Sequence, residues 1–297
     1  MNELFRTIYP LAEFDWFQRY GMHYPVVLSF IIAWCFGIGA CLGSFLNVCI
    51  WRIPRGESLS AKASHCGSCN TPIKWYDNIP IVTYIVLRGR CRSCKTHYSC
   101  RYLIVEALCG LGFVGIFLKV AFSGQPMEIL ANYAWMLLFA VGIAWIDAEH
   151  RIIPDKMNYS ACIMAALFAL VLPGAWGVTS PLRALMLSLF SGLVPGAFLA
   201  IFALAGKAVA RTDVLGWGDV KYIIACGMLI GLPGAIFTVV AGSGIASVTG
   251  LIAAVIRRKQ LRRMTIPFGP FLAGASLVWI FAGEYILRWY LLLAQNH

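Results

Sequence analysis

Residues 129–147 read ILANYAWMLLFAVGIAWID, an apolar run without a charge from Ile129 to Ile146 that ends in an aspartate. Such a run is typical of a transmembrane helix, which needs about 20 mostly apolar residues. A carboxylate beside hydrocarbon is costly, so an acid in this position is a functional candidate. A second acid, Asp219, ends the sequence Gly216-Trp217-Gly218-Asp219 at the edge of another apolar segment. We therefore expect a membrane protein whose two aspartates perform acid–base chemistry.

The composition of the whole chain is that of a polytopic membrane protein. Of the 297 residues, 60% are hydrophobic and 12% are charged, and the mean hydropathy is +0.76. These values exclude an ordinary soluble domain. The sequence Gly231-Leu232-Pro233-Gly234 divides the long apolar stretch 220–256 with a turn. We predict an all-α fold of about eight transmembrane helices, at 25–50, 102–123, 129–147, 157–176, 183–206, 220–233, 234–256 and 270–294.

Lysine and arginine predict the orientation, because they accumulate in cytoplasmic loops. Loop 51–101 and the segment after residue 256 are strongly basic, and with eight helices the basic segments 148–156 and 207–219 fall on the same side. Asp147 and Asp219 then both lie near the cytoplasmic boundary. Residues 1–24 lack the continuous apolar core of a cleavable signal, so we expect a short non-cytoplasmic segment there.

The net charge of +11 also comes from the basic loops. Basic loops beside transmembrane helices follow from topology and from anionic lipid, so we expect a lipid bilayer as the partner and no nucleic acid.

Two C-x-x-C pairs, Cys66/Cys69 and Cys91/Cys94, lie in the predicted cytoplasmic loop. Four thiolates with this spacing are typical of a tetrahedral structural zinc site. The alternative of two disulfides is disfavoured in a reducing cytoplasm. His65 and His97 flank the pairs and are alternative ligands, although four sulfurs suffice. A loop of this size buries little core, so metal binding is expected to provide much of its folding free energy.

The order of several motifs resembles the bacterial type IV prepilin peptidases, which are bifunctional leader peptidase/N-methyltransferases. The resemblance covers roughly residues 40–275 and rests on segments Gly43–Val48, Trp51–Pro54, the paired C-x-x-C motif enclosing Asn78-Ile79-Pro80, Arg101-Tyr102 with Val105-Glu106, Ile146-Asp147, Ile153–Asp155, Gly216–Lys221 and Ile266–Pro270. The G-x-G-D element alone also marks presenilin-like proteases, whereas the ordered set is specific.

The resemblance implies an inner-membrane aspartic protease of type IV pilus or type II secretion systems. It would remove the basic leader from prepilins or pseudopilins and methylate the new N-terminal residue with S-adenosylmethionine. By motif, Asp147 and Asp219 are the catalytic pair, and residues 102–297 form the peptidase core. Neighbouring carboxylates do not both ionise easily, so one keeps its proton while the other acts as base.

The methyl-donor site has no dinucleotide-type glycine loop in this sequence. It would therefore be built from loop 51–101 and the adjoining helix ends, where Asn47, Arg52, Asn78 and Glu106 lie in the matched segments. The structural alternative is that Asn47 and Glu106 pair with each other within the membrane and that Arg52 anchors the first helix at the headgroups.

Other readings of the acids remain open in the sequence. Asp147 alone is compatible with a helix-terminal charge and Asp219 with an N-cap. Asp155 reads as a turn or cap residue and Asp213 as solvated, while Glu149, His150 and Lys221 are candidates for tuning the pair. The rival functions are a presenilin-like intramembrane protease without methyltransferase activity and a zinc-stabilised scaffold or transporter with the aspartates in an ion relay.

Overall fold

The structure, a computed structural model, describes residues 24–59, 65–210, 215–257 and 267–295. The predicted N-terminal segment, Asp213 and most of the basic segment after residue 256 lie outside these residues. The chain divides into two compact units. The first comprises Met1–Cys49 with Ser58–Leu130, and the second comprises Ile50–Glu57 with Ala131–His297.

The first unit is a helix pair that carries a small lobe. Helix α3 spans Tyr24–Arg52 and α5 spans Arg101–Ser123. Gly39 and Gly43 of α3 lie against α5, since a Cβ at Gly39 would be 2.6 Å from the Cys109 carbonyl oxygen and one at Gly43 would be 3.0 Å from the Glu106 Cα. Small residues at this spacing let helix backbones approach closely in membranes. The lobe between the two helices contains the 3-10 turn η3 (Trp75–Asn78) and the short helix α4 (Val82–Val86).

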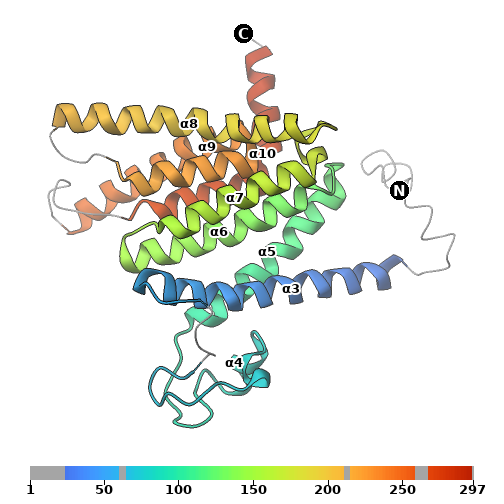
Figure 1. Cartoon of the computed structure of the whole chain (residues 1–297), viewed down its shortest axis with the longest axis vertical. Coiled ribbons are helices and arrows are strands. Elements are labelled where there is room, and N and C mark those ends of the chain that lie inside the picture. The colour runs from blue at the N-terminus through green and yellow to red at the C-terminus, as the bar shows by residue number, and fades with distance from the viewer. Residues whose placement is uncertain (1–23, 60–64, 211–214, 258–266, 296–297) are drawn as a thin grey trace. The chain divides into compact units, whose positions relative to one another are not determined.

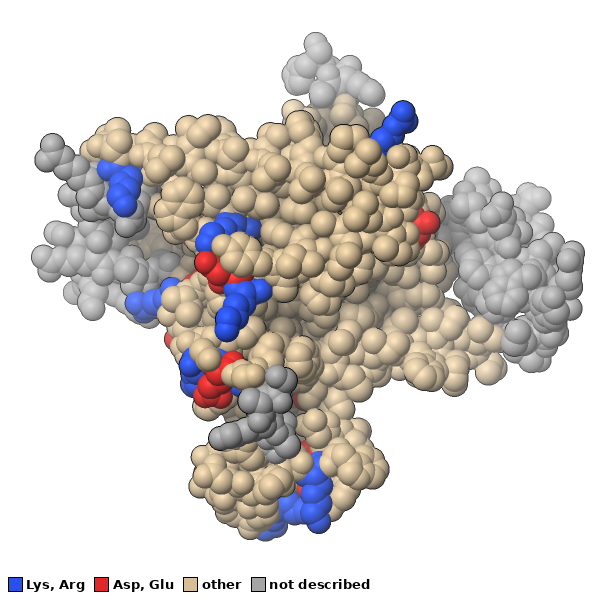
Figure 2. Space-filling view, viewed as in Figure 1, with Lys and Arg blue, Asp and Glu red and all other residues tan. Residues whose placement is uncertain are grey.

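The second unit is a helical bundle built around α9. Its elements are α6 (Ile129–His150), α7 (Asp155–Val171), the 3-10 turn η4 (Pro173–Trp176), α8 (Pro181–Ala210), α9 (Trp217–Arg257) and α10 (Gly269–Gln295) (Figure 1). On the face of the bundle seen in Figure 2, most of the surface is free of charge, and charged side chains gather mainly at one end of the helices. An apolar outer face of this kind suits contact with lipid.

Helix α9 is two antiparallel helices joined at Gly231. Gly231 has φ 81° and ψ 167°, outside the helical region. A straight helix would place residues 12 apart at a distance of about 18 Å, yet Cys226 Sγ lies 3.6 Å from Thr238 Oγ1. The chain therefore reverses between them, as the Gly231–Gly234 turn sequence predicts. The free φ of glycine permits the turn, and Pro233 suits the start of the next helix.

The turn leaves carbonyl groups at the end of the first half of α9 without intrahelical donors. Two buried side chains from other helices provide them. Ser188 Oγ of α8 donates to the Met228 carbonyl at 2.9 Å, and Asn132 Nδ2 of α6 donates to the Leu229 carbonyl at 3.2 Å. Neither Asn132 nor Ser188 belongs to a motif, so the sequence alone does not predict these contacts.

The predicted fold class is confirmed. Six of the helices described are long and apolar enough to cross a membrane. Helix α7, with 17 residues, and the division of α9 bring the arrangement close to the eight predicted helices. The predicted helix 157–176 is too long at its end, because α7 stops at Val171 and Pro173 opens the 3-10 turn η4.

Candidate active site and metal centre

The two aspartates come together from opposite helix ends within the second unit. Asp147 lies in the last turn of α6 and is buried, and Asp219 lies in the first turn of α9 and is half-buried. The carboxylates are close enough to interact electrostatically across 72 residues of chain. Helix α9 begins at Trp217, so Asp219 is its third residue rather than its N-cap.

Asp147 is held by the start of α10. The backbone N–H of Gly269 donates a 2.8 Å hydrogen bond to Asp147 Oδ2. A Cβ at position 269 would lie 2.8 Å from the same oxygen, so a side chain there would collide with the carboxylate. The first N–H groups of a helix have no intrahelical acceptor and carry a partial positive charge. The start of helix α10 thus fixes the position of the Asp147 carboxylate.

Asp219 is held by its own helix start. Its carboxylate accepts a hydrogen bond from the backbone of Gly216, and its N–H donates to the Gly216 carbonyl oxygen at 3.1 Å. An acid at the third helical position that bonds back to the N-cap residue resembles one half of a capping box. A Cβ at Gly218 would lie 2.8 Å from the Ile153 Cβ, so the absence of a side chain there accommodates the chain's own loop.

A buried layer lies one to two helical turns deeper in the bundle than the pair. Tyr222 is fully buried, its ring stacks on Phe139 at a centroid distance of 4.9 Å, and its hydroxyl lies 2.9 Å from Ser276 Oγ. These residues join α6, α9 and α10, the helices that carry Asp147, Asp219 and Gly269. This layer could not be predicted from the sequence, because an aromatic residue in an apolar segment gives no signal of its partner.

Other charged residues near the two aspartates form ion pairs with one another. Asp155 is the first residue of α7, and its Oδ1 forms an ion pair with Lys221 Nζ at 2.7 Å. His150 Nε2 lies 3.9 Å from Glu149 Oε2. The Asp155–Lys221 pair links the start of α7 to the first turn of α9.

The four predicted cysteines form one cluster in the lobe of the first unit. All four sulfurs lie within 4.8 Å of one another, and the Cys66 and Cys94 sulfurs are 3.7 Å apart. A tetrahedron with Zn–S bonds of about 2.3 Å has edges of about 3.8 Å, so the sulfurs fit a zinc ion. His65 and His97 do not belong to this cluster. They lie in the two isolated β-bridges, His65 with Pro72 and Arg90 with His97.

The two halves of the cluster repeat one another. In each half the first cysteine is buried and the second is exposed, and the second lies close to a threonine hydroxyl, Cys69 to Thr71 at 3.2 Å and Cys94 to Thr96 at 3.3 Å. The backbone N–H of Cys94, the Tyr98 hydroxyl and the backbone N–H of Ser93 lower the pKa of Cys91 to about 6. Donors of this kind favour the thiolate, which is the form that binds metal.

The candidate methyl-donor residues are only partly brought together. Asn47 is buried in α3, and its Nδ2 donates to the Tyr102 carbonyl oxygen at 3.2 Å. Glu106 is buried in α5, accepts a 2.8 Å bond from the Ile81 N–H and bonds the Ser44 side chain. Asn47 therefore bonds the backbone of α5, and the structural alternative, a pairing of Asn47 with Glu106, is not among the contacts of these two residues.

The other two candidates have different surroundings. Asn78 is exposed in η3, three residues before Ile81. Arg52 is the buried last residue of α3 and is grouped with the second unit. Ile81 itself has φ 65°, an uncommon conformation for a β-branched residue.

Comparisons with known proteins agree with this architecture. Residues 38–120 match the bacterial peptidase A24 N-terminal domain, and residues 133–255 match the type IV leader peptidase family. The type 4 prepilin-like proteins leader peptide-processing enzyme of Escherichia coli O78:H11 is 34% identical over 291 residues, which cover 90% of this chain and 97% of the relative. The chain belongs to the type IV leader peptidase family.

Further relatives are named prepilin leader peptidase/N-methyltransferase. That of Neisseria gonorrhoeae is 30% identical over 84% of this chain and 90% of its own length, and that of Aeromonas hydrophila is 29% identical over the same shares. No solved structure matches the chain. Within the leader peptidase family, the N-terminal model spans the cysteine cluster and Glu106, and the second model spans both aspartates. Gly269 lies outside both matched segments.

Proposed function

We propose that this protein is an aspartic endopeptidase that removes the basic leader from type IV prepilins or pseudopilins. The observation that carries the proposal is the meeting of Asp147 and Asp219 at the same end of the bundle. The names of the relatives support the substrate class. The aspartates and the zinc lobe face the cytoplasm of a bacterial inner membrane, as the basic loops predict.

The proposed reaction needs one ionised and one protonated carboxyl group. The ionised member takes a proton from a water molecule that attacks the scissile carbonyl. The protonated member polarises that carbonyl and then helps to protonate the leaving amine. A backbone N–H group donates to each carboxylate, that of Gly269 to Asp147 and that of Gly216 to Asp219, so the pair titrates as a unit.

The second activity we propose is methylation of the new N-terminal residue with S-adenosylmethionine. Support comes from the N-methyltransferase names of the relatives and from the buried polar groups of Asn47 and Glu106 beside the zinc lobe. The cofactor supplies an activated methyl group. Asn47, Arg52, Asn78 and Glu106 remain the residues proposed to bind it. Zinc, held by Cys66, Cys69, Cys91 and Cys94, keeps the lobe folded and takes no part in the chemistry.

The test is mass spectrometry of a prepilin incubated with the purified protein and S-adenosylmethionine. Loss of the leader and gain of one methyl group are expected for the unchanged chain. Asp147→Asn and Asp219→Asn should each abolish cleavage yet still methylate a substrate supplied without its leader. Asp155→Asn, which changes a nearby exposed carboxylate, should cleave normally.

The other outcomes separate the rival functions. Cleavage without methylation would leave a peptidase alone, without methyltransferase activity. Absence of cleavage by the folded chain, across several prepilins, would favour a scaffold or transporter.

A further inference from the structure

Helix α4 exposes a continuous apolar face that neither the cysteine cluster nor the polar groups around Glu106 explain. Ile85 and Val86 follow Val82 by three and four residues, which places all three on one side of the helix, and the three are 53%, 62% and 69% exposed in the order Val82, Ile85, Val86. Trp75 in the adjoining turn η3 is 82% exposed. Clustered exposed apolar side chains of this kind mark an interaction surface.

The position of α4 along the membrane-spanning helices indicates what this face meets. Ile81, directly before α4, donates its N–H to Glu106 Oε2 at 2.8 Å. Glu106 is five residues inside α5, which corresponds to about 7 Å at about 1.5 Å per residue. Glu106 also bonds Ser44, which lies eight residues before the end of α3, or about 12 Å. The start of α4 is therefore level with the second turn of α5 and with a point about two turns inside the end of α3.

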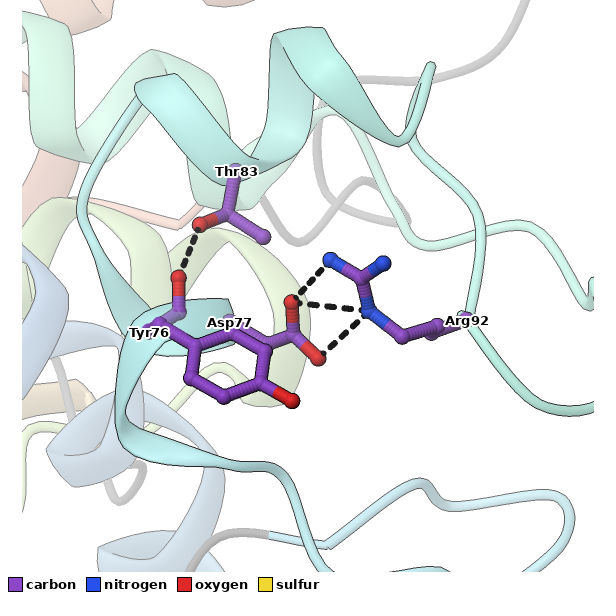
Figure 3. Close-up of polar contacts among 4 residues, drawn as sticks. All are labelled: Tyr76, Asp77, Thr83 and Arg92. Atoms are coloured by element: carbon purple, nitrogen blue, oxygen red, sulfur yellow. Dashed lines mark hydrogen bonds and ion pairs between the residues drawn. The ribbon is translucent and has the colours of Figure 1, made fainter.

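The orientation of α4 is fixed by two contacts shown in Figure 3. Thr83 Oγ1 donates to the Tyr76 carbonyl oxygen at 3.1 Å, which ties α4 to η3. The guanidinium of Arg92, between the cysteines of the second pair, holds both carboxylate oxygens of Asp77 at 2.6–3.0 Å. Helix α4, η3 and the second cysteine pair are thus joined, and the apolar face cannot turn inward without breaking these bonds.

The charge around this face is complementary to anionic lipid. Exposed Arg88 and Arg90 follow α4 directly, and exposed Lys74 precedes η3. The acid of this segment, Asp77, is already paired with Arg92. Basic residues flanking an apolar helical face are typical of segments that lie in the interface of an anionic membrane.

We propose that α4 is an interfacial anchor, which inserts Val82, Ile85 and Val86 into the headgroup region of the bilayer while Arg88 and Arg90 contact anionic lipid. The anchor holds the zinc lobe against the membrane surface. The proposal requires neither peptidase nor methyltransferase activity, so its failure would leave the proposed function untouched.

The test is photo-crosslinking of the full chain in nanodiscs that contain one chain each, made of phosphatidylcholine and phosphatidylglycerol. Benzoylphenylalanine replaces Ile85 or Val86, and exposed Ser68 in the first cysteine pair is the matched control. Zinc content per chain confirms that each variant is folded. Lipid adducts at positions 85 and 86 should exceed those at position 68 by about tenfold.

Two results would contradict the proposal that α4 is an interfacial anchor. One is a yield of lipid adducts at 85 and 86 no higher than at 68, and the other is crosslinking to peptides of the chain itself, which would mean that protein covers the face. Hydrogen exchange of the unsubstituted chain provides a second measurement, because the amides of α4 should be protected in nanodiscs and lose protection in short-chain detergent. Unchanged exchange in the two media would count against insertion.

The proposed contact of Arg88 and Arg90 with anionic lipid is tested with the double variant Arg88→Gln/Arg90→Gln in the same nanodiscs. Phosphatidylglycerol should be over-represented among the adducts relative to its share of the lipid, and the double substitution should restore the mixing ratio. Adducts already at the mixing ratio with both arginines present would overturn the role of anionic lipid.

Discussion

The backbone N–H of Gly269 and the carboxylate of Asp147 are joined by a 2.8 Å hydrogen bond that spans 122 residues of sequence. Gly269 is the first residue of α10, so the carboxylate lies at the positively polarised end of a helix. The same approach leaves no room for a side chain, since a Cβ would lie 2.9 Å from the Asp147 Cβ and 3.0 Å from its Cγ. The position of one aspartate thus depends on a glycine that carries no catalytic group.

Gly269→Ala should therefore lower cleavage strongly. The added methyl group displaces the Asp147 carboxylate, and misplacement of a catalytic group by about 1 Å can cost about 100-fold in rate. Gly274→Ala is the matched control, because a Cβ at that position of α10 meets nothing within 4 Å. Rates measured by mass spectrometry should fall for the first variant alone. Equal rates for the two variants would contradict the contact.

Glu106→Ala should impair methyl transfer and spare cleavage. It removes the acceptor of the Ile81 N–H, and an unsatisfied buried donor costs about 1–3 kcal/mol. The strained Ile81 backbone, with φ 65°, is then free to relax. The measurement is methyl incorporation into a substrate supplied without its leader, with Glu128→Ala, an exposed acid outside the lobe, as control. Methylation at the control rate would remove Glu106 from the proposed site.

Periodic and composition-based features of the fold could be predicted from the sequence. The length of the apolar segments predicted the helices, and the turn at Gly231 was predictable because glycine and proline occur together there. The end of α7 was missed, because Val171 and Leu172 continue the apolar run and only the proline that follows ends the helix. Hydropathy measures solvent preference, whereas the end of a helix depends on backbone geometry.

Functional groups were predictable where a motif carries them and not where the fold creates them. The cysteine spacing predicted a cluster that the sulfurs confirm. The contacts made by Asn132, Ser188 and Ser276 join helices far apart in sequence, and a single sequence contains no information on such pairs. The sequence also left open a pairing of Asn47 with Glu106, whereas their partners are the Tyr102 carbonyl and the Ile81 N–H.

The ion pair of Asp155 with Lys221 should contribute little to stability despite its 2.7 Å distance. Both side chains are substantially exposed, and pairs of this kind are worth about 0.2–1 kcal/mol. A double-mutant cycle with Asp155→Asn and Lys221→Met, followed by thermal unfolding in detergent, should give a coupling in this range that weakens with added salt. A coupling of several kcal/mol, insensitive to salt, would show instead that the pair is shielded from solvent.

Cys91→Ser should release zinc and unfold the lobe while the second unit stays folded. A four-sulfur site that loses one thiolate binds zinc far more weakly, and such sites supply folding free energy directly. Cys100→Ser is the matched control, because Cys100 is exposed and lies outside the cluster. Metal analysis should find about one zinc per chain in the control and much less in Cys91→Ser. Limited proteolysis should then cut Cys91→Ser within the lobe and leave the segment from α6 to α10 intact. A full complement of zinc in Cys91→Ser would exclude Cys91 as an essential ligand.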